Sequence, residues 1–97
     1  MNYFESIYSD NLPSRAVVVY MYLVQRANSD GQCWPSERRI GLDLSMSKST
    51  VKRAVADLVR SGYIRTEQRY RLSGAKSSLL FTISDFEKYR HPRHNSV

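Results

Sequence analysis

The feature that most constrains this chain is a pair of helical segments, each beginning with a serine, that are joined by a three-residue turn at 44–46. Ser36 and Ser47 each stand before residues whose apolar positions recur with helical spacing. Serine is a favoured N-cap because its hydroxyl accepts a hydrogen bond from an otherwise unpaired backbone N–H. We therefore expect one short helix at 36–42 and a longer one at 47–61, arranged as a helix-turn-helix unit.

The longer helix has the clearest apolar periodicity in the sequence. Val51, Val55, Leu58 and Val59 are expected to form one buried stripe along it. Gly62 follows directly, and glycine readily adopts the left-handed conformation that ends many helices. These residues predict a helix packed by one face and exposed on the other.

The flanking segments predict a further helix and a small sheet. Ser14 is the expected cap of a helix that ends near residue 28, with Ala16, Tyr20, Leu23 and Ala27 on its inner face. A short strand at 32–34, two extended runs at 63–71 and 79–83 with a loop at 72–78, and a short helix at 84–89 complete the expected elements.

This order of elements predicts an α+β winged helix-turn-helix: a three-helix core, a small strand after the first helix, a two-stranded β-wing and a short C-terminal helix. A chain of 97 residues has core enough for one domain. We expect that domain to cover 1–90, with a flexible tail at 91–97.

The sequence also resembles a known group of domains. The residues that carry this resemblance are Leu12-Pro13-Ser14, Cys33-Trp34-Pro35-Ser36, Ile40, the run from Leu44 to Ala54, Leu58 and Ser61-Gly62-Tyr63-Ile64. They are similar to the helix-turn-helix domains at the front of phage, plasmid and conjugative-element replication initiators, and more loosely to gluconate-repressor-type transcription regulators. Many such domains have glycine where this chain has Ser45, and such initiators usually continue into a second domain.

Charge is concentrated in the same part of the chain. The net charge is +6, and the segment 36–76 holds ten basic and four acidic residues, so it accounts for the whole excess. The segment 1–35 holds two basic and three acidic residues. A basic surface over a helix-turn-helix unit favours double-stranded DNA as the partner.

On the longer helix, we expect the residues that read base edges to be Lys48, Ser49, Lys52 and Arg53. At about 100° per residue, the last three of these lie opposite the apolar stripe, and the first turns of a recognition helix enter the major groove. The alternative is an ordinary solvated charged face.

Other residues are expected to position the protein on the DNA backbone. Ser47 and Thr50, at the helix start, are candidates to hold a phosphate. Arg38 and Arg39 are candidates from the short helix before it.

In the wing, Arg69, Arg71 and Lys76 flank a glycine-containing loop suited to the minor groove or its phosphates, with Arg65 a weaker candidate. Equally, charges on a hairpin can serve to discourage edge-to-edge aggregation.

Two further expectations concern apolar residues. Trp34 is expected to be a core residue that holds the first helix against the wing. The apolar residues Tyr3, Phe4, Ile7 and Tyr8, together with the run 17–24, offer more apolar surface than one small core needs, so a homodimer through the terminal segments is expected.

Several classes of protein are disfavoured. One Cys and two His give no metal-binding or nucleophilic cluster, and no phosphate-binding glycine loop is present, so we expect no enzyme, cofactor or small-molecule ligand. Asp43, Asp57 and Glu67 are expected to be surface charges. No apolar run is long enough for a membrane span, and the lone Cys33 suits a reducing cytoplasm.

Three functions remain open. The first is a small transcription regulator or accessory factor of a bacterial mobile element, and the second is the DNA-binding part of a replication initiator. The third is a winged helix that docks on proteins without nucleic acid. RNA is disfavoured, because aromatic and basic residues do not alternate on a predicted sheet as stacking platforms require.

Overall fold

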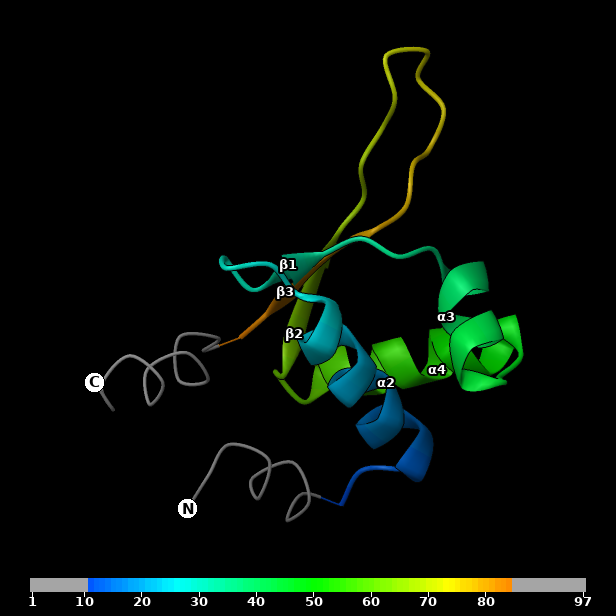
Figure 1. Cartoon of the computed structure of the whole chain (residues 1–97), viewed down its shortest axis with the longest axis vertical. Coiled ribbons are helices and arrows are strands. Elements are labelled where there is room, and N and C mark those ends of the chain that lie inside the picture. Colours follow the sequence, from blue (N-terminus) through cyan, green and yellow to red (C-terminus); the bar gives the residue numbers. More distant parts are fainter. Residues whose placement is uncertain (1–10, 85–97) are drawn as a thin grey trace.

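Three helices and a three-stranded antiparallel sheet make up residues 11–84, the part of the chain that the computed structural model describes (Figure 1). The elements in chain order are α2 (Ser14–Arg26), β1 (Gln32–Cys33), α3 (Glu37–Leu44), α4 (Lys48–Arg60), β2 (Ile64–Glu67) and β3 (Leu80–Ile83). The strand order is β1-β3-β2, which places the last strand in the middle. The fold is the expected α+β winged helix, with the small strand after the first helix.

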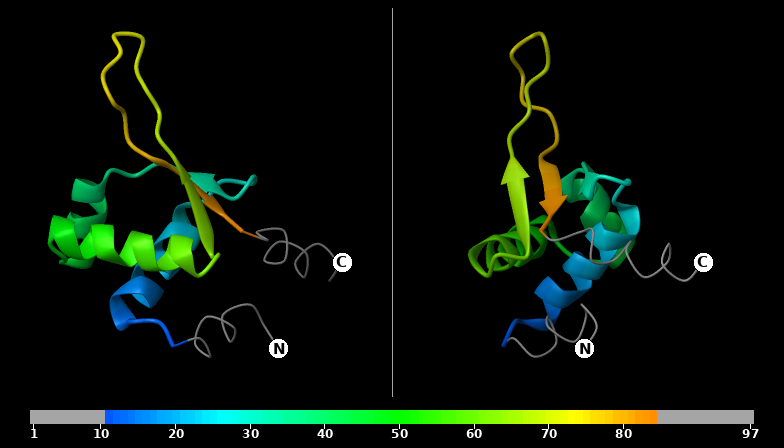
Figure 2. Two further views of the ribbon diagram at one scale, coloured as in Figure 1. Left: turned by 180° about the vertical axis from the view of Figure 1, so that it is seen from behind. Right: turned by 90° about the vertical axis from the view of Figure 1, so that its left-hand side faces the viewer.

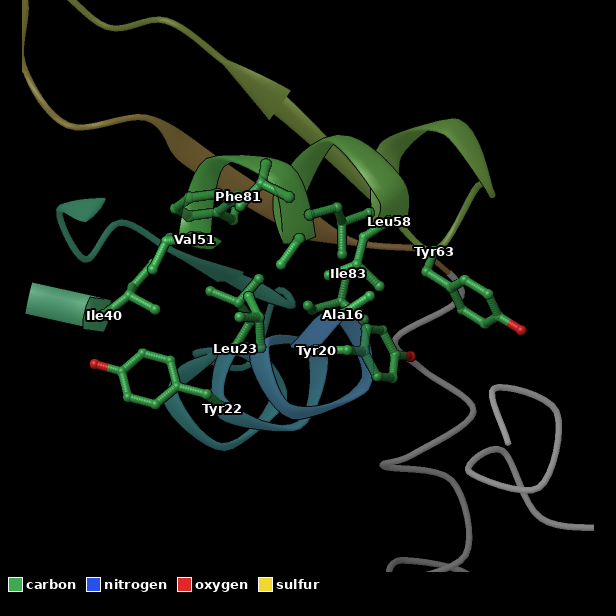
Figure 3. Packing of buried hydrophobic residues seen from close by; sticks show 14 of the residues in the cluster. Ala16, Tyr20, Tyr22, Leu23, Ile40, Val51, Leu58, Tyr63, Phe81 and Ile83 are labelled. Atoms are coloured by element: carbon green, nitrogen blue, oxygen red, sulfur yellow. The ribbon is translucent and has the colours of Figure 1, made fainter. Parts of the chain in front are cut away.

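One apolar core joins the helices to the sheet (Figure 3). Tyr20, Leu23, Ile40, Leu58 and Phe81 are all fully buried, and they come from α2, α3, α4 and β3. Burying an aliphatic or aromatic side chain of this size contributes roughly 1.5–3 kcal/mol relative to leaving it exposed. The core therefore fixes α4 against α2 and the sheet.

The apolar stripe of α4 differs from the expected one at a single position. Val51, Leu58 and Val55 are buried as expected, whereas Val59 is 42% exposed and Ala54 is fully buried instead. On a helix, Ala54 lies about 60° from the direction of Val51 and Val59 about 80° on the other side. Val59 therefore falls at the edge of the packed face.

Both serine caps of the helix-turn-helix unit are confirmed. The Ser36 Oγ accepts from the Arg39 backbone N–H at 3.0 Å, and the Ser47 Oγ accepts from the Thr50 backbone N–H at 3.1 Å. The expected cap at Ser14 is wrong, because the N-cap of α2 is Pro13 and no side chain caps that helix. α3 also ends at Leu44, two residues later than expected.

The turn between α3 and α4 depends on two unusual residues. Ser45 adopts the left-handed conformation at φ 57°, the position at which many of the similar domains carry glycine. The Met46 backbone N–H donates to the Gly41 carbonyl at 2.9 Å. A Cβ at Gly41 would lie 2.6 Å from the Met46 carbonyl oxygen, so the turn can close this tightly only over glycine. Gly62 ends α4 at φ 82°, as expected.

The wing is a long hairpin that extends beyond the helices (Figure 2). Its first strand ends at Glu67, earlier than the expected 63–71. Farther out, the Ser77 N–H donates to the Arg69 carbonyl at 2.9 Å, and Tyr70 and Lys76 form an isolated bridge. The loop is therefore shorter than the expected 72–78, because Lys76 and Ser77 pair with the opposite arm of the hairpin.

Some expectations lie outside the described residues. These are the short helix at 84–89, of which only Ser84 is described, the tail at 91–97 and the apolar N-terminal segment proposed for dimerisation. The boundary of the domain at 90 therefore stays a prediction. Within residues 11–84, no helix is long and apolar enough to cross a membrane.

Candidate nucleic-acid interface

The first half of α4 presents a polar and basic face to solvent. Lys48, Ser49, Lys52 and Arg53 are all exposed, and the last three lie on the half of the helix opposite Val51 and the core. The outward orientation expected from helical spacing is therefore confirmed for Ser49, Lys52 and Arg53, and Lys48 at the start of the helix is exposed as well.

The start of α4 is preorganised by its cap. The Ser47 and Thr50 hydroxyls lie 2.8 Å apart, and the Ser47 Oγ also accepts the Thr50 backbone N–H. The two hydroxyls are thus hydrogen-bonded to each other. The backbone N–H groups of the first turn have no partner within the helix, so at this end of the helix they can bind an anion.

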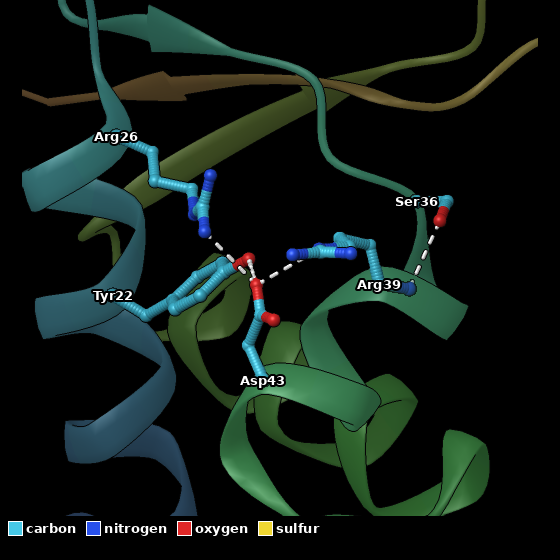
Figure 4. A network of polar contacts seen from close by, with 5 residues as sticks. All are labelled: Tyr22, Arg26, Ser36, Arg39 and Asp43. Atoms are coloured by element: carbon cyan, nitrogen blue, oxygen red, sulfur yellow. Dashed lines mark hydrogen bonds and ion pairs between the residues drawn. The ribbon is translucent and has the colours of Figure 1, made fainter.

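Asp43 holds α3 against α2 (Figure 4). Its Oδ2 accepts from the Tyr22 hydroxyl at 2.5 Å, from Arg26 Nη2 at 2.9 Å and from Arg39 Nε at 3.1 Å. The hydrogen bond from Tyr22, supported by the two arginines, lowers the pKa of Asp43. Burial and the hydrogen bond to Asp43 raise the pKa of Tyr22. Arg39, a candidate for the DNA backbone, is therefore engaged within the protein.

A second aspartate joins α2 to α4. Asp57 is only 6% exposed, and its carboxylate pairs with Arg15 at 3.1 Å and with Arg60 one turn along α4. The expectation that Asp57 is a surface charge is therefore wrong. A buried carboxylate needs a compensating partner, and no local sequence pattern reveals the pairing with Arg15, which lies 42 positions away.

The remaining cations have no ion pair within the described part of the chain. They lie on α3, on the first half of α4 and on the hairpin, and they are Arg38, Lys48, Lys52, Arg53, Arg65, Arg69, Arg71 and Lys76. We call these residues the unpaired cations. They form no ion pair with the described acidic residues, so these elements carry positive charge that is available to a polyanion.

Trp34 corrects another expectation. It lies in the loop between β1 and α3, is 50% exposed and does not belong to the core. In an extended segment successive side chains point to opposite sides, and here the inward position is taken by Cys33, which is 5% exposed. The Arg69 guanidinium carbon lies 5.5 Å from the centroid of the Trp34 ring, in cation–π contact.

Two further cations of the hairpin lie near its tip. Arg71 and Lys76 are exposed on its two arms, and the Arg71 N–H donates to the Ala75 carbonyl at 2.8 Å. Leu72, between them, is fully exposed. The two arms of the hairpin are therefore paired up to a short tip, and each arm carries an exposed cation there.

Among residues 11–84, no three His, Cys, Asp or Glu side chains gather as metal ligands would. Burial raises the pKa of the Cys33 thiol to about 11, so this thiol stays neutral. Exposed cations around α4 thus remain the main candidate site.

The pattern of a helix-turn-helix domain family matches residues 10–64, more than half of the chain. The chain belongs to this family. Among curated proteins, none matches the chain significantly.

Two solved structures share the fold. One, described as a possible transcriptional regulator from Methanosarcina mazei Go1, superposes with a TM-score of 0.63 at 18% identity. The match covers 84% of this chain and 63% of that one. The other, the transcriptional regulator SlyA, gives a TM-score of 0.52 at 20% identity over 96% of this chain and 59% of SlyA. This helix-turn-helix chain thus spans about three fifths of the length of either protein.

Proposed function

We propose that this protein binds double-stranded DNA at specific sequences, with α4 in the major groove and the hairpin along the neighbouring backbone or minor groove. The observation that supports this proposal is the division of the basic residues into those with and those without an acidic partner. Four arginines of the described residues pair with Asp43 or Asp57, while the unpaired cations all lie on α3, the first half of α4 or the hairpin. The elements that dock on DNA in this fold keep their charge available.

The roles divide by position. Lys52 and Arg53 would contact base edges, most simply guanine, whose O6 and N7 accept two hydrogen bonds from arginine. Lys48 and Ser49 would reach base edges or phosphates at the start of the helix. The residues proposed for phosphate or minor-groove contact are Ser47, Thr50, Arg38, Arg69, Arg71 and Lys76.

The proposed biological role is that of a small transcription regulator or accessory factor of a bacterial mobile element. The two solved structures with this fold, both described as regulators, support the regulatory part of the proposal. A second copy of the chain would let α4 read both halves of an inverted repeat. The dimer itself is proposed on the apolar terminal segments.

The test is selection of binding sites from a random duplex library at one fixed salt concentration. It compares the unchanged protein with Lys52→Ala and Arg53→Ala, and with Arg60→Ala as a matched control. Arg60 lies on the same helix and is also exposed, but it is paired with Asp57. We expect a defined motif that changes in Lys52→Ala or Arg53→Ala, at a cost of about 1–3 kcal/mol at the base concerned.

The outcomes separate the alternatives. An inverted repeat in the selected motif would support the dimer. A motif that no α4 variant alters would overturn the assignment of α4 as the recognition helix. Weak binding without any motif, lost at physiological salt, would favour a winged helix that docks on another protein.

A further inference from the structure

Trp34 is the only tryptophan of the chain, and it stands at the junction of three elements. It follows β1 and precedes the Ser36 cap of α3, and the guanidinium of Arg69 from the hairpin lies over its ring at 5.5 Å. Half of the tryptophan surface stays exposed. A large aromatic side chain at a charged, exposed junction is not explained by packing of the core.

The backbone that carries Arg69 is held in place. Its carbonyl accepts from the Ser77 N–H at 2.9 Å and from Gln68 Nε2 at 3.0 Å. Gln68 Nε2 also donates to the Ser77 carbonyl at 2.9 Å, so the side-chain amide links the two arms where regular strand pairing has ended. The hairpin is thus braced at the residue that meets Trp34.

The contact with Trp34 leaves the hydrogen-bonding groups of the guanidinium available. Cation–π attraction acts between the charge and the face of the ring, so it uses no hydrogen-bond acceptor of the protein, and Arg69 is exposed. No acidic side chain of the described residues pairs with Arg69. The charged edge is therefore free to bind two oxygens of one phosphate.

We propose that Trp34 and Arg69 form one preorganised contact for a phosphate of duplex DNA, between the bases read by α4 and the backbone below the wing tip. Arg69 binds the phosphate, and Trp34 is the positioning residue that fixes the direction of Arg69. Exposed Arg38, in the first turn of α3, follows Trp34 by four positions and adds a further positive charge to this part of the chain. This inference rests on the proposed function and adds a residue, Trp34, that it does not include.

The proposal predicts a particular pattern of losses. Removing Arg69 removes one phosphate contact, so affinity falls about tenfold and the salt slope falls by about one unit. Removing Trp34 leaves the charge but not its orientation, so affinity falls about three- to fivefold. Since both changes disrupt one contact, the double variant should bind no more weakly than Arg69→Ala alone.

The experiment measures the affinity of the full chain for one duplex of selected sequence and one of random sequence, over a series of salt concentrations. The variants are Trp34→Ala, Trp34→Phe, Arg69→Ala and Trp34→Ala with Arg69→Ala, and Arg60→Ala is the control for loss of an exposed charge. Trp34→Phe keeps an aromatic face and should restore most of the affinity. Losses should be equal on both duplexes, because a phosphate contact carries no base information.

Tryptophan fluorescence gives an independent readout. Since the chain has a single Trp, emission reports on Trp34 alone. We expect Arg69→Ala to change the emission of the free protein, and addition of duplex to change the emission of the unchanged protein more than that of Arg69→Ala.

Contrary results would be clear. Additive losses in the double variant, or a salt slope unchanged in Arg69→Ala, would overturn the joint contact even if α4 variants still alter the motif. A loss in Trp34→Ala that follows only from a lower melting temperature would show a structural role instead. If the chain binds neither duplex, the proposed function fails together with this inference.

Discussion

The helical body and the proposed DNA-binding surface use basic residues in opposite ways. In the body, Arg15 and Arg60 converge on Asp57, and Arg26 and Arg39 converge on Asp43. Along α4 and the hairpin, the unpaired cations face solvent. The comparison teaches that net charge alone does not define a binding surface. The acidic partners decide which cations stabilise the fold and which stay available.

The two aspartates also differ from each other. Asp57 is almost fully buried between α2 and α4, whereas the side chain of Asp43 is 22% exposed in a contact between α2 and α3. Exposed ion pairs contribute little because water screens them and the side chains lose freedom. Loss of a buried partner costs more, because a charge is then left without compensation.

The largest expected effect follows from removing the buried carboxylate. Asp57→Ala should lower the free energy of unfolding by about 2 kcal/mol, less than for a fully enclosed pair because both guanidinium groups reach water. Urea denaturation measures it, with Glu67→Ala as the control, since Glu67 is exposed and has no ion pair among the described residues. Equal stability of Asp57→Ala and Glu67→Ala would show that the paired carboxylate stabilises the fold no more than an unpaired one.

A smaller effect on the stability of the fold is expected from a change of pH. The pKa of Asp43 is lowered from 3.8 in the folded protein, so its ionised form stabilises the fold. That contribution is complete above the unfolded-state value and is lost as pH falls through the folded-state pKa. Tyr22 behaves in the opposite sense: its pKa is raised above 10.0, so its contribution is present below that value and is lost as pH rises through the folded-state pKa.

Melting temperature as a function of pH checks this prediction. Tyr22→Phe removes the hydrogen bond that most lowers the pKa of Asp43, so the loss of stability in acid should be shallower than in the unchanged protein. Tyr70→Phe is the matched control, because Tyr70 is 64% exposed. Identical acid profiles for all three proteins would show that the hydrogen bond from Tyr22 does not stabilise the ionised form of Asp43.

The smallest expected effect on stability is that of an unpaired cation. Arg53→Ala should change the free energy of unfolding by no more than about 0.5 kcal/mol, as is usual at exposed sites without special contacts. Arg60→Ala should cost slightly more, since it leaves Asp57 with one cation. Thermal unfolding of Arg53→Ala and Arg60→Ala compares an unpaired with a paired arginine on the same helix. A larger loss in Arg53→Ala would show that Arg53 has a structural role.

Much of the candidate interface follows from the local sequence pattern. Periodicity of the apolar residues orients α4, and this orientation alone places Lys52 and Arg53 outward. The error at Val59 is small because it concerns only the edge of that stripe. The errors at Trp34 and Asp57 are larger, because residue type alone predicts a buried tryptophan and an exposed aspartate, and here Trp34 is half exposed and Asp57 is buried.

The sequence by itself determined the two serine caps, the short turn between them and the position of Gly62, because each depends on hydrogen bonds and backbone angles within a few residues. Only the tertiary structure decided that Arg15 reaches Asp57 and that Arg69 meets Trp34, since 42 and 35 positions separate these partners. It also decided that Gly41 must have no side chain, because the obstacle is the Met46 carbonyl. Contacts between distant segments depend on how the helices and hairpin pack, and no periodic pattern encodes that directly.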